Sequence, residues 1–97
     1  MTNRIDWESQ IGKRLRLRDL YAFSTVIRLG SMGKAALELG VSQPAVSEVI
    51  ADLEHAVGAR LFDRTPRGVE PTAEGSSLER HVVAAFEAGH EGYRILI

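Results

Sequence analysis

The sequence has no cysteine, so neither a disulfide framework nor a thiolate metal site is available to it. It also has no run of about 18 apolar residues and no signal-peptide core near its N-terminus, which predicts a soluble cytoplasmic chain without a membrane partner. Its 97 residues are enough for one domain with a single modest core.

The familiar signatures of catalysis are absent as well. The histidines at positions 55, 81 and 90 lack the spacing of metal ligands, and they are expected on the surface. Gly75, Ser76 and Ser77 lack the G-x-S-x-G frame of a nucleophile elbow, and no phosphate loop or dinucleotide fingerprint occurs. We therefore expect no catalytic residue, no metal site and no enzymatic activity.

An excess of one charge sign is also missing, because 12 Lys and Arg face 13 Asp and Glu, for a net charge of −1. DNA-binding domains usually carry a basic surface, so a neutral domain without a nucleic-acid role stays open. The charges are nevertheless unevenly distributed. Cations that precede most of the acids are Arg4, Lys13, Arg14, Arg16, Arg18, Arg28 and Lys34. Acids of the last third are Glu70, Glu74, Glu79, Glu87 and Glu91. A basic DNA-binding part and an acidic helix that faces a partner would give this distribution.

Residues 30–58 predict a short helix, a tight turn and a longer helix. Ser31 can cap the first helix, and Gly40 stands where the chain must leave it with a positive φ. Ser42 can cap the second helix, at about 43–57, and Pro44 is tolerated in its first turn. The apolar residues that recur at helical spacing in this second helix are Val46, Val49, Ile50, Leu53 and Val57.

The polar residues of the second helix lie on its other face. Gln43, Pro44, Ser47 and Glu48 are expected to point outward from its first turns. Two helices joined by a short turn, with polar groups at the N-terminal end of the second, are typical of a helix-turn-helix that binds DNA. The alternative is an ordinary corner between two helices of a helical core.

Further elements surround this motif. A helix over about 18–29 precedes it, and a hairpin with strands at 61–64 and 69–71 follows. Thr72 can cap a last helix that starts at about 73. The predicted fold is mainly α, a winged helix-turn-helix of three helices plus a small β-hairpin wing with a C-terminal linker helix. Its parts are a basic arm at 1–16, a DNA-binding domain at 17–72 and a linker or dimerisation helix at 73–97.

The last helix carries a stripe of apolar and small residues. Positions 78, 82, 85, 89, 92 and 96 alternate at spacings of four and three, which suits pairing with a second helix. Val82, Phe86 and Tyr93 would otherwise stay partly exposed. The residues predicted to dimerise the chain are Leu78, Val82, Ala85, Phe86, Gly89 and Tyr93. Alternatively, this helix packs on its own domain.

Several motifs in combination resemble one known family. They are Val-Ser-Gln-Pro-Ala-Val-Ser at 41–47, Leu-Glu at 53–54, Gly58 and Leu-Phe-Asp-Arg at 61–64. Over about 17–76 the chain resembles the N-terminal DNA-binding domain of LysR-type transcriptional regulators. The resemblance implies a bacterial regulator that binds inverted-repeat operators as a homodimer or tetramer. A small-molecule effector would bind a C-terminal domain that this sequence does not contain, so a fragment without cofactors is expected.

The resemblance also places residues at the DNA. Ser42, Gln43, Pro44 and Ser47 fall on the groove-facing positions of the family. A Gln can bond to adenine N6 and N7, a Pro ring suits a thymine methyl, and Ser hydroxyls with helix-start N–H groups can hold a phosphate. Ser31, at the start of the preceding helix, is a further DNA-binding candidate.

The cations of the motif complete the predicted site. Lys34 matches a position that is usually basic, and Arg67 at the wing tip can enter a minor groove or contact phosphates. Arg64 either contacts DNA or pairs with a carboxylate within the fold.

Some residues depart from the family's pattern. Glu48 stands where Arg or Lys is common, and phosphates repel it unless it accepts from cytosine N4. Met32 and Gly33 replace a commoner aromatic residue and Thr. A second hypothesis is therefore a protein-interaction or dimerisation module with weak or lost DNA binding. The intact Ser42 to Pro44 segment and Lys34 argue against it.

Overall fold

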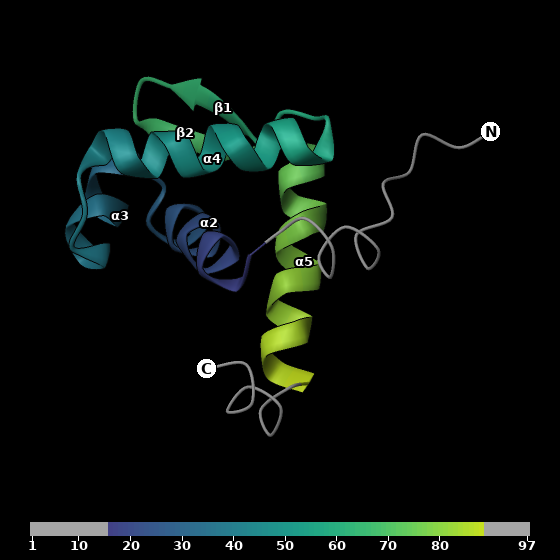
Figure 1. Ribbon diagram of the computed structural model, residues 1–97. Helices are drawn as coiled ribbons and strands as arrows, with labels where there is room; N and C mark the ends of the chain where they lie inside the picture. The colour runs from purple at the N-terminus through teal and green to yellow at the C-terminus, as the bar shows by residue number, and fades with distance from the viewer. Residues whose placement is uncertain (1–15, 89–97) are drawn as a thin grey trace.

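The computed structural model describes residues 16–88, which form four helices and one two-stranded sheet (Figure 1). The helices are α2 (Leu17–Leu29), α3 (Met32–Leu39), α4 (Gln43–Val57) and α5 (Ala73–Ala88). Strands β1 (Phe62–Thr65) and β2 (Gly68–Pro71) pair antiparallel as a hairpin. The predicted winged helix-turn-helix is confirmed, whereas the arm predicted at 1–16 lies, except for Arg16, outside the described residues.

The predicted helix ends are confirmed by their hydrogen bonds. Ser31 Oγ accepts from the Lys34 amide at 3.1 Å, and Ser42 Oγ accepts from the Ala45 amide at 3.2 Å. Gly40 leaves α3 with φ of 71°, which a residue with a side chain adopts only under strain. The turn between α3 and α4 is therefore fixed by local chemistry on both sides.

One core joins the three helices of the motif to the hairpin and to α5. Phe23 of α2 is fully buried, and its ring lies 5.4 Å from that of Phe62 in β1. The remaining buried apolar residues of the core cluster are Leu20, Val26, Met32, Ala35, Ala36, Val46, Ile50, Leu53, Leu61, Val69, Leu78 and Val82. Each large side chain buried here contributes roughly 1.5–3 kcal/mol by transfer from water. No described helix is long and apolar enough to cross a bilayer.

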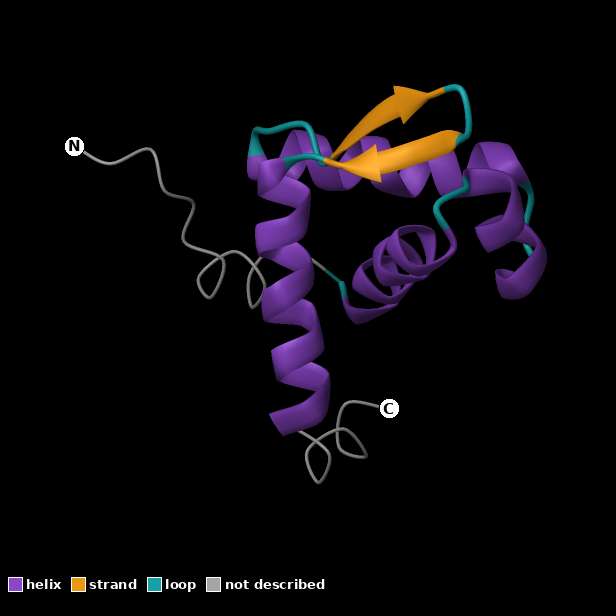
Figure 2. Cartoon of the chain, turned by 180° about the vertical axis from the view of Figure 1, so that it is seen from behind, coloured by secondary structure: helices purple, strands orange, loops and turns teal. Residues whose placement is uncertain are grey.

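Helix α5 corrects the predicted dimerisation stripe. Leu78 and Val82 are 0% and 1% exposed, because they pack into the core of their own domain. The expectation that Val82 would be left exposed is therefore wrong. Further along, Ala85 is exposed and Phe86 is half-buried against the core. In Figures 1 and 2 this C-terminal half of α5 extends past α2. Gly89 and Tyr93 lie outside the described residues.

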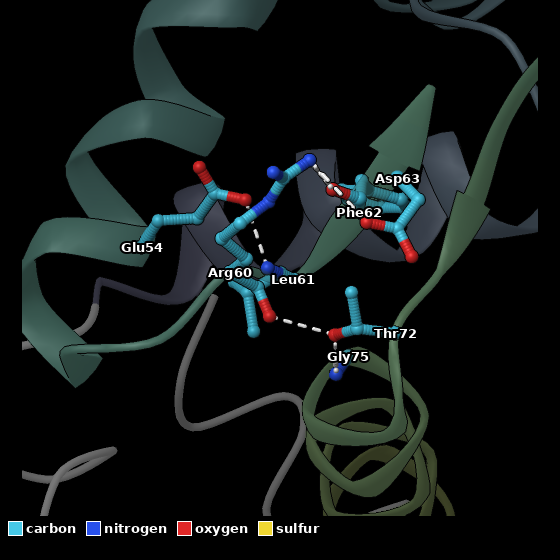
Figure 3. Close-up of polar contacts among 7 residues, drawn as sticks. All are labelled: Glu54, Arg60, Leu61, Phe62, Asp63, Thr72 and Gly75. Carbon is cyan, nitrogen blue, oxygen red and sulfur yellow. Dashed lines mark hydrogen bonds and ion pairs between the residues drawn. The ribbon is translucent and has the colours of Figure 1, made fainter. Parts of the chain in front are cut away.

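Polar contacts attach the hairpin to α4 and α5 (Figure 3). The Leu61 amide donates to Glu54 Oε2 at 2.8 Å, and the Leu61 carbonyl accepts from the Thr72 amide at 3.0 Å. Thr72 Oγ1 donates to the Arg60 carbonyl at 2.6 Å and accepts from the Gly75 amide at 3.0 Å, so it caps α5 as predicted. The end of α4, the base of the hairpin and the start of α5 thus share one hydrogen-bonded network.

Two glycines allow close backbone approaches at the hairpin. A Cβ on Gly75 would lie 2.1 Å from the Leu61 carbonyl oxygen. A Cβ on Gly68, whose φ is 143°, would lie 2.2 Å from the Gly30 carbonyl oxygen. That oxygen also accepts from the Val69 amide at 3.1 Å. The hairpin is consequently attached to α5 at one end and to the turn between α2 and α3 at the other.

A carboxylate is partly buried between α2 and α5. Ser24 Oγ donates to Glu79 Oε2 at 3.0 Å, while Glu79 Oε1 is buried and has no hydrogen-bond partner within residues 16–88. Burial raises the pKa of Glu79, and the hydrogen bond from Ser24 only partly opposes this. The ionised form of Glu79 therefore opposes the packing of α5 on α2.

We expect Glu79→Gln to raise the thermal midpoint by a few degrees at pH 7 and to give no gain near pH 4. Because the pKa of Glu79 is higher in the folded state, the folded state binds the proton more tightly than the unfolded state does. The resulting stabilisation is complete below the ordinary carboxyl pKa and is lost as the pH rises through the raised pKa. Thermal unfolding at the two pH values measures it. Glu87→Gln, at an exposed carboxylate of the same helix, is the control. An equal gain from Glu79→Gln at both pH values would contradict the argument.

Candidate nucleic-acid interface

The first turns of α4 present the side chains that the sequence placed outward. Ser42, Gln43, Pro44 and Glu48 are all exposed. Their opposite side is the buried row of Val46, Ile50 and Leu53, each at most 3% exposed. The predicted orientation of the helix is thus confirmed, and a rigid apolar face supports the exposed end. Contact of these residues with DNA stays a prediction.

The N-terminus of α4 offers fewer donors to a phosphate than the sequence suggested. The Ala45 amide donates to Ser42 Oγ, and the Val46 amide donates to the Ser42 carbonyl at 3.2 Å. Pro44 has no N–H. Of the amides of Gln43, Ala45 and Val46, only that of Gln43 lacks a partner within the described chain. An anion here would be held by that amide and by the Ser42 hydroxyl, whose hydrogen is still free to donate.

Ser47 lies at the edge of this face rather than at its centre. It is half-buried and borders a groove of about 300 Å³ between α4 and the hairpin. The residues that line the groove are Met32, Ser47, Ile50, Ala51, Glu54, Arg60, Phe62, Arg64 and Val69. Ser47 and Arg64 therefore belong to one concave surface, contributed by the helix and by β1.

The structure separates the two roles left open for Arg64. Its side chain is exposed, and no carboxylate among the described residues forms an ion pair with it. The cation that pairs locally is Arg60, which contacts Asp63 at 3.3 Å and donates to the Phe62 carbonyl at 3.2 Å. The guanidinium of Arg64 is thus available for an external anion.

Further cations flank the exposed end of α4. Lys34 is exposed on α3, beside the capping Ser31, and Arg67 is exposed in the turn of the hairpin. Figure 1 shows the hairpin running alongside α4, with its turn at the end where α4 begins. The Arg67 amide donates to Thr65 Oγ1 at 3.2 Å, which braces this turn. Positive charge therefore approaches the N-terminus of α4 from α3 and from the hairpin.

Negative charge lies on α4 itself. Glu48 and Asp52 are exposed, one turn apart, and neither forms an ion pair within residues 16–88. Their charge lowers the positive potential over the helix face that the flanking cations surround.

Sequence reasoning missed some residues of this surface. Arg60 lines the groove, yet no motif or spacing in the sequence marked it as part of the site. Gly33 was noted as unusual, but its position next to the Gln43 side chain could not be read from spacing, because the two residues belong to different helices.

Comparison with known proteins identifies the family that the chain resembles. Residues 17–76 match the family described as bacterial regulatory helix-turn-helix protein, lysR family. The uncharacterised regulator YdcI of Escherichia coli K12 is 40% identical over 80 residues, covering 82% of this chain and 26% of that protein. The activator AmpR of Rhodobacter capsulatus is 45% identical over 74 residues, covering 76% and 26%. The chain thus spans about a quarter of the length of these curated relatives.

Solved structures with the same fold include DNA complexes. The BenM DNA-binding domain on catB site 1 DNA has a TM-score of 0.75 and 30% identity, covering 82% of this chain and 90% of that chain. The CbnR DNA-binding domain bound to DNA has a TM-score of 0.73 and 36% identity, covering 81% and 92%. The likeness spans nearly the whole of both domains.

Proposed function

The chain belongs to the LysR family of bacterial regulatory helix-turn-helix proteins, and from this we propose that it binds operator DNA with α4 in the major groove. The observation that carries the proposal is the N-terminal end of α4, where Gln43 and Pro44 stand exposed against a buried apolar face. A reading helix needs such rigid support, because base contacts lose their specificity when the side chains that make them can shift.

Each side chain of this surface has a chemical role in the proposal. Gln43 bonds to adenine N6 and N7, and the ring of Pro44 packs on a thymine methyl. Ser42 and the Gln43 amide hold a phosphate at the start of α4. The residues proposed to contact the backbone or minor groove around them are Ser31, Lys34, Ser47, Arg64 and Arg67.

The chain works by binding rather than by catalysis in this proposal. Its target would be the chromosome in the bacterial cytoplasm, at interrupted inverted repeats. A small-molecule effector would act through a separate domain of a longer protein. The acidic Glu48 and Asp52 are then a cost to non-specific affinity and not a sign of lost DNA binding.

Replacing Gln43 should reduce sequence preference, whereas replacing Arg67 should reduce affinity for every DNA sequence. Gln43→Ala should cost ~1–3 kcal/mol on the specific site and relax preference at one base pair per half-site. Arg67→Ala should weaken all sequences alike and reduce the salt slope by about 1, because it removes a phosphate contact. Binding to a randomised operator library at two salt concentrations separates the two. An unchanged ranking of sites in Gln43→Ala would mean that another residue reads that base.

Glu48→Arg should raise non-specific affinity and steepen its salt dependence, because the change adds a phosphate-binding cation to the exposed face of α4. A carboxylate in the groove is tolerated where it accepts from cytosine N4, so discrimination should fall or move from C toward G. The same library provides the measurement, with Asp52→Arg one turn away as the comparison. If Glu48→Arg strengthens every site equally, Glu48 points away from the bases.

We propose that the chain forms a homodimer through the C-terminal half of α5, which extends past α2. A longer protein that contains this chain would form a tetramer from two such dimers. Leu78 and Val82 support α5 from within, so the contact would use Ala85, Phe86 and the residues that follow. A dimer would place two α4 helices on the two half-sites of an inverted repeat.

Ala85→Glu should shift the chain toward monomer in sedimentation over a concentration series, because it puts a charge into the proposed helix pairing. Ala84→Glu makes the same change at an exposed neighbour on another side of the helix and should leave the association unchanged. A wild-type chain that sediments as a monomer throughout would overturn the proposed dimer.

A further inference from the structure

The side chain of Gln43 rests against the start of α3. A Cβ added to Gly33 would lie 3.3 Å from Gln43 Oε1 and 3.9 Å from its Cδ. The carboxamide at the beginning of α4 therefore occupies the space that a side chain at position 33 would take. Both residues belong to the exposed end of the helix-turn-helix, so this contact lies within the surface proposed to meet DNA.

The surroundings of Gly33 favour the carboxamide. Gly33 is in the first turn of α3, two residues after the capping Ser31. The Ser31 hydroxyl lies 3.7 Å from the same added Cβ and is held by the Lys34 amide, so it borders this space from the other side. The partial positive charge of a helix N-terminus attracts a carbonyl oxygen such as Gln43 Oε1.

We propose that Gly33 is a positioning residue that sets the base preference of α4 through Gln43. This inference rests on the proposed function and adds to it a determinant outside α4. With no side chain at position 33, the carboxamide leans toward α3 and reaches the bases from that side. A larger residue would exclude the carboxamide from this space and turn it along the groove, toward a different base edge.

The size of the effect follows from the contact distance. A Cβ alone, at 3.3 Å from Oε1, requires the flexible carboxamide to move by only a few tenths of an ångström. A β-branched side chain adds two further heavy atoms beside this Cβ, so we expect the carboxamide to adopt another rotamer. We therefore expect a graded series in which Gly33→Ala is mild and Gly33→Val is strong. None of these changes strains the backbone, because Gly33 has no positive φ.

The test is a randomised operator library bound by the full chain and its variants. Gly33→Val should change preference about fivefold or more at the base pair whose readout Gln43→Ala relaxes, with the salt slope unchanged. In the Gln43→Ala background the same Gly33→Val should change nothing. Gly33→Thr, which has the same shape as Val, separates this effect from a new hydroxyl contact to phosphate. Circular dichroism confirms that each variant is folded.

The outcomes are distinct. An equal change by Gly33→Val and Gly33→Thr, abolished by Gln43→Ala, supports the inference. A change that only Gly33→Thr produces, or one that persists in Gln43→Ala, overturns it while wild-type sequence preference still supports the proposed function. An unaltered ranking in Gly33→Val also overturns it. A wild-type chain that enriches no sequence overturns the proposed function and the inference together.

Discussion

The wing and the last helix keep their places relative to α4 because the backbone of Leu61 is hydrogen bonded on both sides. Its amide is bound by Glu54 from the last turns of α4, and its carbonyl accepts from Thr72 just before α5. Its side chain is fully buried in the core. Gly75 then lets α5 start directly against that carbonyl. The arrangement of helix, hairpin and last helix therefore depends on one junction of a few residues.

The helix-turn-helix could be predicted from the sequence because its signals are local. Ser31, Gly40 and Ser42 each act within a few residues, and the range expected for the second helix, 43–57, is the observed range of α4. What the apolar face of α5 packs against could not be predicted in the same way. Periodicity identifies an apolar face, but it does not identify what covers that face. Leu78 and Val82 were assigned to a partner chain, whereas the core of their own domain covers them.

The site shows the same division between local and long-range information. Exposure of Gln43, Pro44 and Glu48 followed from helical spacing alone. Arg64 forms no ion pair within residues 16–88, and Asp63 pairs with Arg60 instead. The number of amides at the start of α4 that can donate to a ligand depends on which of them already donate to Ser42, and only the structure shows this. The sequence therefore did not predict the contacts between helices, nor which groups would compete for the same hydrogen bonds.

The two close approaches at the hairpin limit how this domain can vary in length. Gly68 sits under the Gly30 carbonyl and Gly75 under the Leu61 carbonyl, so a residue inserted near either glycine would separate backbones that now touch. Pro66 and Arg67, between the strands, are exposed, and neither supplies an atom to these contacts, although Arg67 directly precedes Gly68. An insertion between the strands is therefore expected to lengthen the hairpin while both contacts stay in place. The length of the hairpin can thus change in this fold without a change in its direction, because the direction is set by the two contacts.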